Sequence, residues 1–391
     1  MPAENHKMNP IYLDHNATTP TRPEVVEAVA RAMAENYANP ASQHQAGQRA
    51  RRVLEDARER IAEILGGNLS GPAADRLIFT SGGTEANNLA MLGIARLNHP
   101  QQGHIVISAA EHPSVIEPAE QLLKAGWQLD VLGVNEQGLV RTERLAGLLA
   151  PQTRLVSVLL GNHDTGVEQP IAKVVEICDA AGVPVHTDAV QAIGKLPVNF
   201  RALGVALMSI GAHKFQGPPG IGALLVRHAI SLEPILYGGS QQGNTRPGTE
   251  PVALVLGMLT ALECWLAEQQ AHRVRQEKLR EQFESGLQAG YPGLVINGGQ
   301  APRLPNTSNI AFPGLDGQVL LMALDMVGIA CSVGSACSSG STELSPTLLA
   351  MGLPKSIVGS SLRFSLGATT TAAEIDEAIQ RILRVCREIR G

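Results

Sequence analysis

Residues 183–191, VPVHTDAVQ, decide the fold together with residues 206–214, ALMSIGAHK. Each stretch begins as an apolar, strand-like run and ends in polar residues. The first run closes on Asp188, and the second leads through a Gly-Ala-His turn to Lys214. Because ligands of layered α/β folds bind at the carboxyl ends of the strands, we expect Asp188 and Lys214 to lie at one edge of a sheet.

The surrounding chain repeats this pattern of apolar runs separated by amphipathic stretches. Nearly continuous Val/Ile/Leu runs are typical of strands that are covered on both faces. One intervening segment, Pro170–Ala181, has a single apolar helical face. The alternation predicts a layered α/β domain with a mostly parallel, seven-stranded sheet. Its strands are expected at Arg76–Thr80, His104–Ser108, Gln128–Val134, Arg154–Leu160, Val183–Thr187, Ala206–Ile210 and Ile221–Val226.

The alternation of apolar runs and amphipathic stretches ends after Thr249. Pro251–Ala289 reads as one long helix, and the chain closes with a helix at Ala372–Arg390 that Thr371 or a neighbour can cap. We place a domain boundary inside the long helix. Residues 16–262 are expected to form a large domain, and residues 1–15 and 263–391 a smaller α/β domain.

Composition narrows the classes of function. The chain has 391 residues, 44% of them hydrophobic, with a formal net charge of −5, so a nucleic-acid partner is not expected. Met1–Pro10 lacks the apolar stretch of a signal peptide, and no run of about 18 apolar residues occurs, so we expect a cytoplasmic protein without a membrane partner. Five cysteines in such a chain argue against a disulfide framework, and no metal-ligand motif is found.

A carboxylate and a lysine at neighbouring strand ends match what a pyridoxal site needs. The lysine forms a Schiff base with the pyridoxal aldehyde, and the carboxylate keeps the pyridine nitrogen protonated, which makes the ring an electron sink. Lys214 is one of only seven lysines in the chain. Taken singly, a surface lysine and a helix-capping aspartate explain Lys214 and Asp188 equally well.

Two further segments follow predicted strands. The turn TSGGTEANN (80–88) can place Gly83, Thr84 and free helix-start amides against an anion, although a simple helix cap explains it as well. His112 follows the run His104–Ser108, and its imidazole can stack on a ring and move protons near neutral pH. A lone histidine after a strand is more often an ordinary loop residue.

With these residues in place, the chain resembles the NifS/IscS-type cysteine desulfurases, which are class V of the fold-type I pyridoxal 5'-phosphate (PLP) enzymes. The resemblance covers nearly the whole chain. It is carried, in order, by YLDHNATTP (12–20), NPAS (39–42), SGGTE (81–85), EH (111–112), DAVQ (188–191), HK (213–214), RPGT (246–249), GSAC (334–337) and RFS (363–365).

The resemblance implies a fold-type I homodimer that converts L-cysteine to L-alanine and passes the sulfur to acceptor proteins of iron–sulfur assembly or tRNA thiolation. Lys214 would carry PLP covalently, and Asp188 would pair with its pyridine nitrogen. The resemblance also implies roles for other residues: Gln191 at the ring phenolate, His112 on the ring face, Gly83, Thr84 and His213 at the phosphate, Thr249 from the other subunit, and Arg363 at the substrate carboxylate.

Cys337 is the expected nucleophile, which takes the sulfur as a persulfide. Its segment, SVGSACSSGS (332–341), is small and polar and belongs to an expected loop at about 331–345. Burial as a small hydrophobe is the ordinary role of a cysteine, and it fits Cys178, Cys264 and Cys386, which lie in helix-like stretches. Cys331 is also compatible with this role. The same role fits Cys337 poorly because no apolar residue flanks it.

Two departures from the family pattern touch the expected pocket. His163 stands where the family has an asparagine that contacts the cofactor phenolate, and Gly211 stands where the family has a serine or threonine that binds phosphate. An imidazole can still donate a hydrogen bond, and the backbone N–H of Gly211 can still serve. These changes leave two alternatives open: a related PLP enzyme acting on selenocysteine or cysteine sulfinate, and a weakly active homologue that mainly binds partners.

Overall fold

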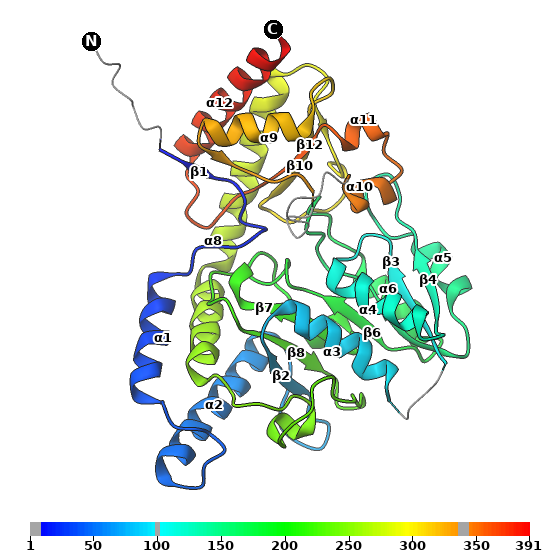
Figure 1. Cartoon of the computed structure of the whole chain (residues 1–391), viewed down its shortest axis with the longest axis vertical. Coiled ribbons are helices and arrows are strands. Elements are labelled where there is room, and N and C mark those ends of the chain that lie inside the picture. Colours follow the sequence, from blue (N-terminus) through cyan, green and yellow to red (C-terminus); the bar gives the residue numbers. More distant parts are fainter. Residues whose placement is uncertain (1–8, 98–101, 335–343) are drawn as a thin grey trace.

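A seven-stranded sheet lies at the centre of this computed structural model, which describes residues 9–97, 102–334 and 344–391 (Figure 1). The strand order is β2-β8-β7-β6-β5-β3-β4. The strands span Arg76–Thr80 (β2), His104–Ser108 (β3), Gln128–Leu132 (β4), Thr153–Ser157 (β5), Val185–Asp188 (β6), Leu207–Gly211 (β7) and Gly222–Val226 (β8). Each predicted run overlaps one of these strands, with ends that differ by a few residues, so the predicted α/β sheet is confirmed.

One strand runs against the others. Strand β8 pairs antiparallel with both β2 and β7, whereas the remaining pairs are parallel. A parallel connection needs a crossover of a dozen or more residues, usually a helix. Only the short turn that begins with Ala212–Lys214 and ends before Gly222 separates β7 from β8, so the chain has to return beside β7.

Both faces of the sheet are buried, as the continuous apolar runs predicted, except at the edge strand β4, where Gln128, Asp130 and Val131 are exposed. In β2, Ile78 points to one core, and Leu77 and Phe79 point to the other. The first core lies under α3 (Gly83–Ala95) and α4 (Pro113–Lys124). The second lies under α2 (Gln45–Ile64), α5 (Thr142–Leu148), α6 (Ile171–Asp179) and α7 (Phe200–Leu203).

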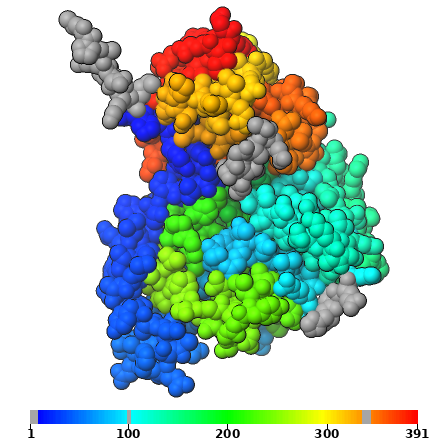
Figure 2. Space-filling view, in the orientation of Figure 1, coloured from blue at the N-terminus to red at the C-terminus, as the bar shows by residue number. Residues whose placement is uncertain are grey.

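The C-terminal part has its own sheet and its own core. Strand β10 (Thr307–Ala311) pairs antiparallel with β9 (Val295–Ile296) and β12 (Ser361–Ser365). Near the N-terminus, β1 (Ile11–Tyr12) pairs in parallel with β11 (Ile329–Ala330), so the start of the chain joins this part (Figure 2). The helices of this part are α9 (Gly317–Met326), α10 (Pro346–Ala350), α11 (Lys355–Val358) and α12 (Ala372–Arg390).

Helix α12 begins where the sequence predicted. The Thr371 hydroxyl accepts a hydrogen bond from the backbone N–H of Glu374, and the Glu374 carboxylate accepts one from the backbone N–H of Thr371. This reciprocal capping box satisfies two amides that the helix itself cannot bond.

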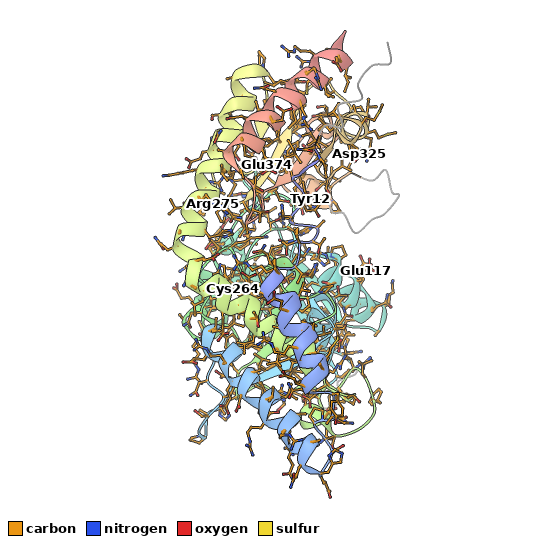
Figure 3. The ribbon with its side chains drawn as sticks, turned by 90° about the vertical axis from the view of Figure 1, so that its left-hand side faces the viewer. Tyr12, Glu117, Cys264, Arg275, Asp325 and Glu374 are labelled. Atoms are coloured by element: carbon orange, nitrogen blue, oxygen red, sulfur yellow. The ribbon has the colours of Figure 1, made fainter. Side chains whose placement is uncertain are left out.

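Helix α8 (Val252–Gly290) connects the two parts (Figures 1 and 3). Its first half packs on α1 (Pro23–Glu35) and α2, and its second half packs on α12. Among the described residues, α8 is the one helix long and apolar enough to cross a membrane. Its apolar residues Val255, Met258 and Leu262 are buried, and core helices pass the same test. The limits of the two domains stay a prediction, since α8 runs through residue 262 without a break.

Glu111 ties two strand ends together at the edge where Asp188 lies. One oxygen of its buried carboxyl accepts hydrogen bonds from the Ser108 hydroxyl, at the end of β3, and from the backbone N–H of Leu159, just beyond β5. Burial, with the nearby charge of Asp188, raises the pKa of Glu111 to about 8. The carboxyl is therefore protonated at neutral pH and joins the strands without a charge.

This raised pKa predicts a pH dependence of stability. Between the usual value of 4.5 and about 8, the folded state binds a proton at Glu111 that the unfolded state has released. The free energy of unfolding therefore falls as pH rises through this window. We expect the isosteric variant Glu111→Gln to lack this contribution and to gain roughly 2 to 4 kcal/mol relative to wild type between pH 5 and pH 8.

Urea unfolding at the two pH values measures the difference. Glu117→Gln, at an exposed carboxylate of the same helix region (Figure 3), serves as the control and should show no such gain. Parallel pH profiles for Glu111→Gln and wild type would contradict the assignment.

Candidate active site

A cavity of about 400 Å³ opens at the carboxyl ends of the central strands. Its volume is within the usual range for small-molecule sites. Residues from both parts of the chain line it: Asn16, Ala17, Gly83, Thr84, Asn87, His112, Ser114, Leu159, Gly161, His163, Asp188, Val190, Gln191, His213, Lys214 and Arg363.

Asp188 is the last residue of β6 and is held on both carboxylate oxygens. Oδ2 accepts a hydrogen bond of 2.7 Å from the side-chain amide of Asn87 on α3, and Oδ1 accepts one of 2.9 Å from the backbone N–H of Val190. Two residues earlier in β6, His186 bridges the hydroxyls of Ser157 and Ser209, and burial lowers the pKa of this imidazole to about 4. Its two hydrogen bonds thus fix the orientation of the Asp188 carboxylate, and the neighbouring His186 is uncharged at neutral pH.

Lys214 ends the short 3-10 turn Ala212–Lys214 that follows β7. Its Nζ donates to the backbone carbonyls of Asn16, at 2.5 Å, and Ala17, at 2.7 Å. The N-terminal segment therefore meets the predicted cofactor lysine directly, although the two are almost 200 positions apart in sequence.

The start of α3 forms a third side of the cavity. The helix begins at Gly83, three residues after β2 ends, and the first amides of a helix have no partner within it. A Cβ on Gly83 would lie 2.6 Å from Val190, so only glycine allows this close approach. A Cβ on Gly211 would lie 3.4 Å from the Gly83 nitrogen, so a side chain at position 211 would point at these amides.

Three imidazoles line the cavity. His112 caps α4, and its Nδ1 accepts from the backbone N–H of Ser114. Its ring meets that of His163 edge to face, with centroids 5.3 Å apart. Burial, with His112 nearby, holds the pKa of His163 well below its usual range, and burial beside Lys214 lowers the pKa of His213 to about 4. At neutral pH, His163 and His213 can each donate one hydrogen bond and accept one.

Arg363 reaches the cavity from β12 in the C-terminal sheet and is 2% exposed. Its Nη2 pairs with Asp14 at 2.8 Å, and its Nη1 donates to the backbone carbonyl of His163 at 3.1 Å. Its Nε atom is buried and has no hydrogen-bond partner among the described residues. A guanidinium anchored in this way is prepared to bind a carboxylate.

The chain on either side of residues 335–343 is attached to the same cavity. Ser332 forms backbone hydrogen bonds in both directions with Arg363, at 2.7 and 3.1 Å. After residue 343, the Ser345 hydroxyl donates to the carboxylate of Asp164, which follows His163 in the sequence. Cys337 itself lies outside the described residues.

The four described cysteines are free thiols. Cys178 and Cys386 are buried, and burial raises the pKa of each to about 12. Burial also raises the pKa of Cys331. The thiols of Cys178, Cys331 and Cys386 therefore remain protonated at neutral pH and are poor nucleophiles.

The structure brings most of the predicted site residues to one cavity. Gly211 does not line this cavity, although a Cβ there would lie against Gly83 and Val190, which do, and Thr249 lines a different cavity, beside α1. The predicted site residues that line the cavity are Gly83, Thr84, His112, His163, Asp188, Gln191, His213, Lys214 and Arg363.

Sequence reasoning missed three polar residues at the site. Asn16 and Asn87 lie inside quoted motifs but received no role. Lys195 is buried directly behind Gln191, and its Nζ donates to the Gln191 Oε1 at 2.6 Å. Its position four residues after Gln191 was the available signal, but a lysine gives no indication of burial by its type.

Comparisons with known proteins agree with this geometry. The model of the family "Aminotransferase class-V" matches residues 11–378. The chain is 39% identical to the cysteine desulfurase IscS of Dictyoglomus turgidum, over 97% of this chain and 95% of that protein. A solved NifS-like protein superposes with a TM-score of 0.88 at 32% identity, covering 97% of this chain and all of the other.

A second similar structure is a complex with a small molecule. SspA in complex with cysteine superposes with a TM-score of 0.79 at 29% identity, covering 92% of this chain and 99% of the other. The family match, the relative and the structures all extend over nearly the full length. This chain therefore belongs to the class-V aminotransferase family.

Proposed function

We propose that this chain is a PLP-dependent cysteine desulfurase that transfers the sulfur of L-cysteine to Cys337. The observation that carries the proposal is the convergence of Lys214, Asp188 and Arg363 on one cavity, to which both flanks of residues 335–343 are attached. The relatives named cysteine desulfurase support the same reaction.

The residues present fit PLP. The cavity offers an amine at Lys214, a fixed carboxylate at Asp188, and the unbonded amides at the start of α3 for a phosphate. Gly83 adds no side chain of its own beside those amides. His112 and Gln191 complete the walls.

Bound PLP would supply an electron sink for the amino acid substrate. The chain's own groups then have separate tasks. Arg363 binds the substrate carboxylate, Lys214 accepts and returns the proton of the substrate Cα, and His112 assists proton transfer from the capped start of α4. Asp188 holds the pyridine nitrogen in its charged form.

Sulfur transfer is balanced without an external oxidant. The Cys337 thiolate attacks the substrate sulfur, so an S–S bond forms as the substrate Cβ–S bond breaks. The electron pair of the broken bond stays on Cβ, which takes a proton to give alanine. The persulfide on Cys337 then passes its outer sulfur to an acceptor.

Partners and location belong to this proposal as well. L-cysteine is the substrate, and the cysteine complex of SspA supports that choice. The enzyme acts in the cytoplasm as a homodimer in which Thr249 enters the partner's site, and it passes sulfur to scaffold or tRNA-thiolation proteins. Thr249 does not line the active-site cavity of its own chain, which is compatible with that role.

A second candidate is turnover of selenocysteine or cysteine sulfinate on the same residues. Neutral, buried His163 favours it, because it places an imidazole where the family has an amide. A larger ring beside His112 changes the shape of the cavity that both residues line.

Replacing Cys337 separates cofactor binding from sulfur transfer. With a thiol reductant, we expect wild type to give equal amounts of alanine and sulfide from L-cysteine. Cys337→Ala should stay yellow with PLP but form no persulfide, because the attacking thiolate is gone. Sulfide release is measured colorimetrically and the persulfide by mass spectrometry.

Cys264→Ala is the matched control, since Cys264 is partly exposed on α8 and does not line the cavity. It should keep full turnover. Lys214→Ala should lose the yellow colour. Unchanged sulfide release by Cys337→Ala would refute the nucleophile assignment.

A second prediction concerns the missing hydroxyl at position 211. Gly211 has extended backbone angles, φ −139° and ψ 120°, which any residue adopts, and its Cβ direction points at the Gly83 amide. Gly211→Ser should therefore add a donor to the phosphate and tighten PLP binding about tenfold, or about 1.4 kcal/mol. Absorbance titration of the apoprotein with PLP measures it.

Gly211→Ala adds the Cβ without the hydroxyl and should not tighten binding. Equal affinities of the serine and alanine variants would show that no phosphate lies near position 211.

The two candidate substrates are separated by parallel assays of L-cysteine, selenocysteine and cysteine sulfinate. We expect the highest kcat/KM for L-cysteine in wild type. If His163 sets the preference, His163→Asn shifts the ratio of the three kcat/KM values, because the amide is smaller than the imidazole. Higher wild-type kcat/KM for either of the other substrates would favour the second candidate.

A further inference from the structure

We propose that Lys195 is a positioning residue that fixes the amide of Gln191 so that its NH2 group serves the cofactor ring. The proposal rests on the proposed PLP function of the cavity. It concerns a residue that lies behind the cavity wall and is not itself among the lining residues.

Lys195 is buried, with 6% exposure, and its Nζ has two amide oxygens as acceptors. It donates to Gln191 Oε1 at 2.6 Å and to Asn16 Oδ1 at 3.0 Å. Among the ion pairs of the described residues, none joins Lys195 to a carboxylate. Burial of an amine is unfavourable unless hydrogen bonds compensate, so a lysine here is explained by what it binds.

The charges that face Lys195 are positive. Burial, followed by Lys214 and Arg363, holds the pKa of Lys195 well below its usual range. His15, on the other side, has a pKa lowered to about 4 by burial and by Lys195, so it is neutral. The amine therefore acts as a hydrogen-bond donor in a polar wall and not as half of a salt bridge.

The local backbone places Lys195 beside Lys214. Gly194 has a φ of +81°, and a Cβ there would lie 2.3 Å from the Cβ of Phe215, the residue after Lys214. Glycine at 194 thus lets the turn that carries Gln191 and Lys195 pack against the turn that carries Lys214. Lys195 and Lys214 line the same small cavity of about 40 Å³ behind the main one.

An ammonium or amine donor decides how the amide of Gln191 is oriented. Nζ donates to the oxygen of the amide at 2.6 Å. The NH2 group then points the other way. One of its hydrogens goes to the backbone carbonyl of Asn16 at 2.9 Å. The second hydrogen remains for an oxygen in the cavity, which Gln191 lines.

Without Lys195, only the bond from the NH2 group to the Asn16 carbonyl holds the Gln191 amide in this orientation, and the amide can rotate by half a turn when that bond breaks. Its oxygen would then face the cavity and repel an anionic oxygen of the bound ring. Asn16 Oδ1 would keep a donor from Asn306, at 3.2 Å, so the loss falls mainly on Gln191.

The test is a double-mutant cycle read from cofactor absorbance. The variants are Lys195→Met, Gln191→Met and the double variant, each loaded with PLP. The measurement is the midpoint pH of the absorbance change of the lysine-bound cofactor. Loss of the donor to the ring oxygen should raise that midpoint by about one pH unit in either single variant, because the proton shared with the Lys214 nitrogen is then held to higher pH.

The double variant should show no further rise, because Lys195 acts through Gln191. Lys173→Met, at an exposed lysine that pairs with Glu176, controls for the loss of a lysine charge and should leave the midpoint unchanged. An unchanged midpoint in Lys195→Met would overturn the inference, and so would single-variant shifts that add in the double variant.

A remaining comparison covers a failure of Lys195→Met to fold. The double variant replaces the pair by two apolar side chains and leaves no unpaired amide oxygen, so it can be compared with Gln191→Met alone. Equal midpoints support the inference, and different midpoints reject it. Uptake of PLP by wild type is measured first. A wild type that takes up no PLP would reject the proposed function, and the midpoints could then not be measured.

Discussion

One buried asparagine joins the elements that form the cavity. The backbone carbonyl of Asn16 accepts hydrogen bonds from Gln191 and Lys214, and its side-chain oxygen accepts from Lys195. Its side-chain NH2 donates to the carbonyl of His163 and to the hydroxyl of Thr307 on β10. Asn16 thus connects the edge of the central sheet to the C-terminal sheet. Since it is 1% exposed, these bonds have no competition from water.

Local patterns were enough to predict most of the fold. The apolar runs gave the positions of all seven strands of the central sheet, and Thr371 marked the start of α12, because both signals act within a few residues. The sequence predicted a mostly parallel sheet but did not identify β8 as the antiparallel strand, since its direction follows from the short connection between β7 and β8. The pairing of β1 with β11 joins residues more than 300 positions apart, and no local pattern contains it.

The site was predicted unevenly for a similar reason. Asp188 and Lys214 follow apolar strands, so the rule for carboxyl ends of strands placed them together. Arg363 was found through the family resemblance, and its pairing with Asp14 could not be read from the sequence. Lys195 and Asn16 were missed because their importance lies in burial and in partners. Neither property is visible in a residue type that usually lies at the surface.

The single helix α8 has a consequence for how the molecule comes apart. At 1.5 Å per residue its 39 residues extend about 60 Å, and it contributes Val255 and Leu262 to one core and Leu279 and Phe283 to another. Melting of either core removes the packing that holds one half of the helix, and a helix half without packing is only marginally stable in water. Loss of order is thereby transmitted along the shared helix, so the two ends of the protein are thermodynamically coupled and favour joint unfolding over independent unfolding.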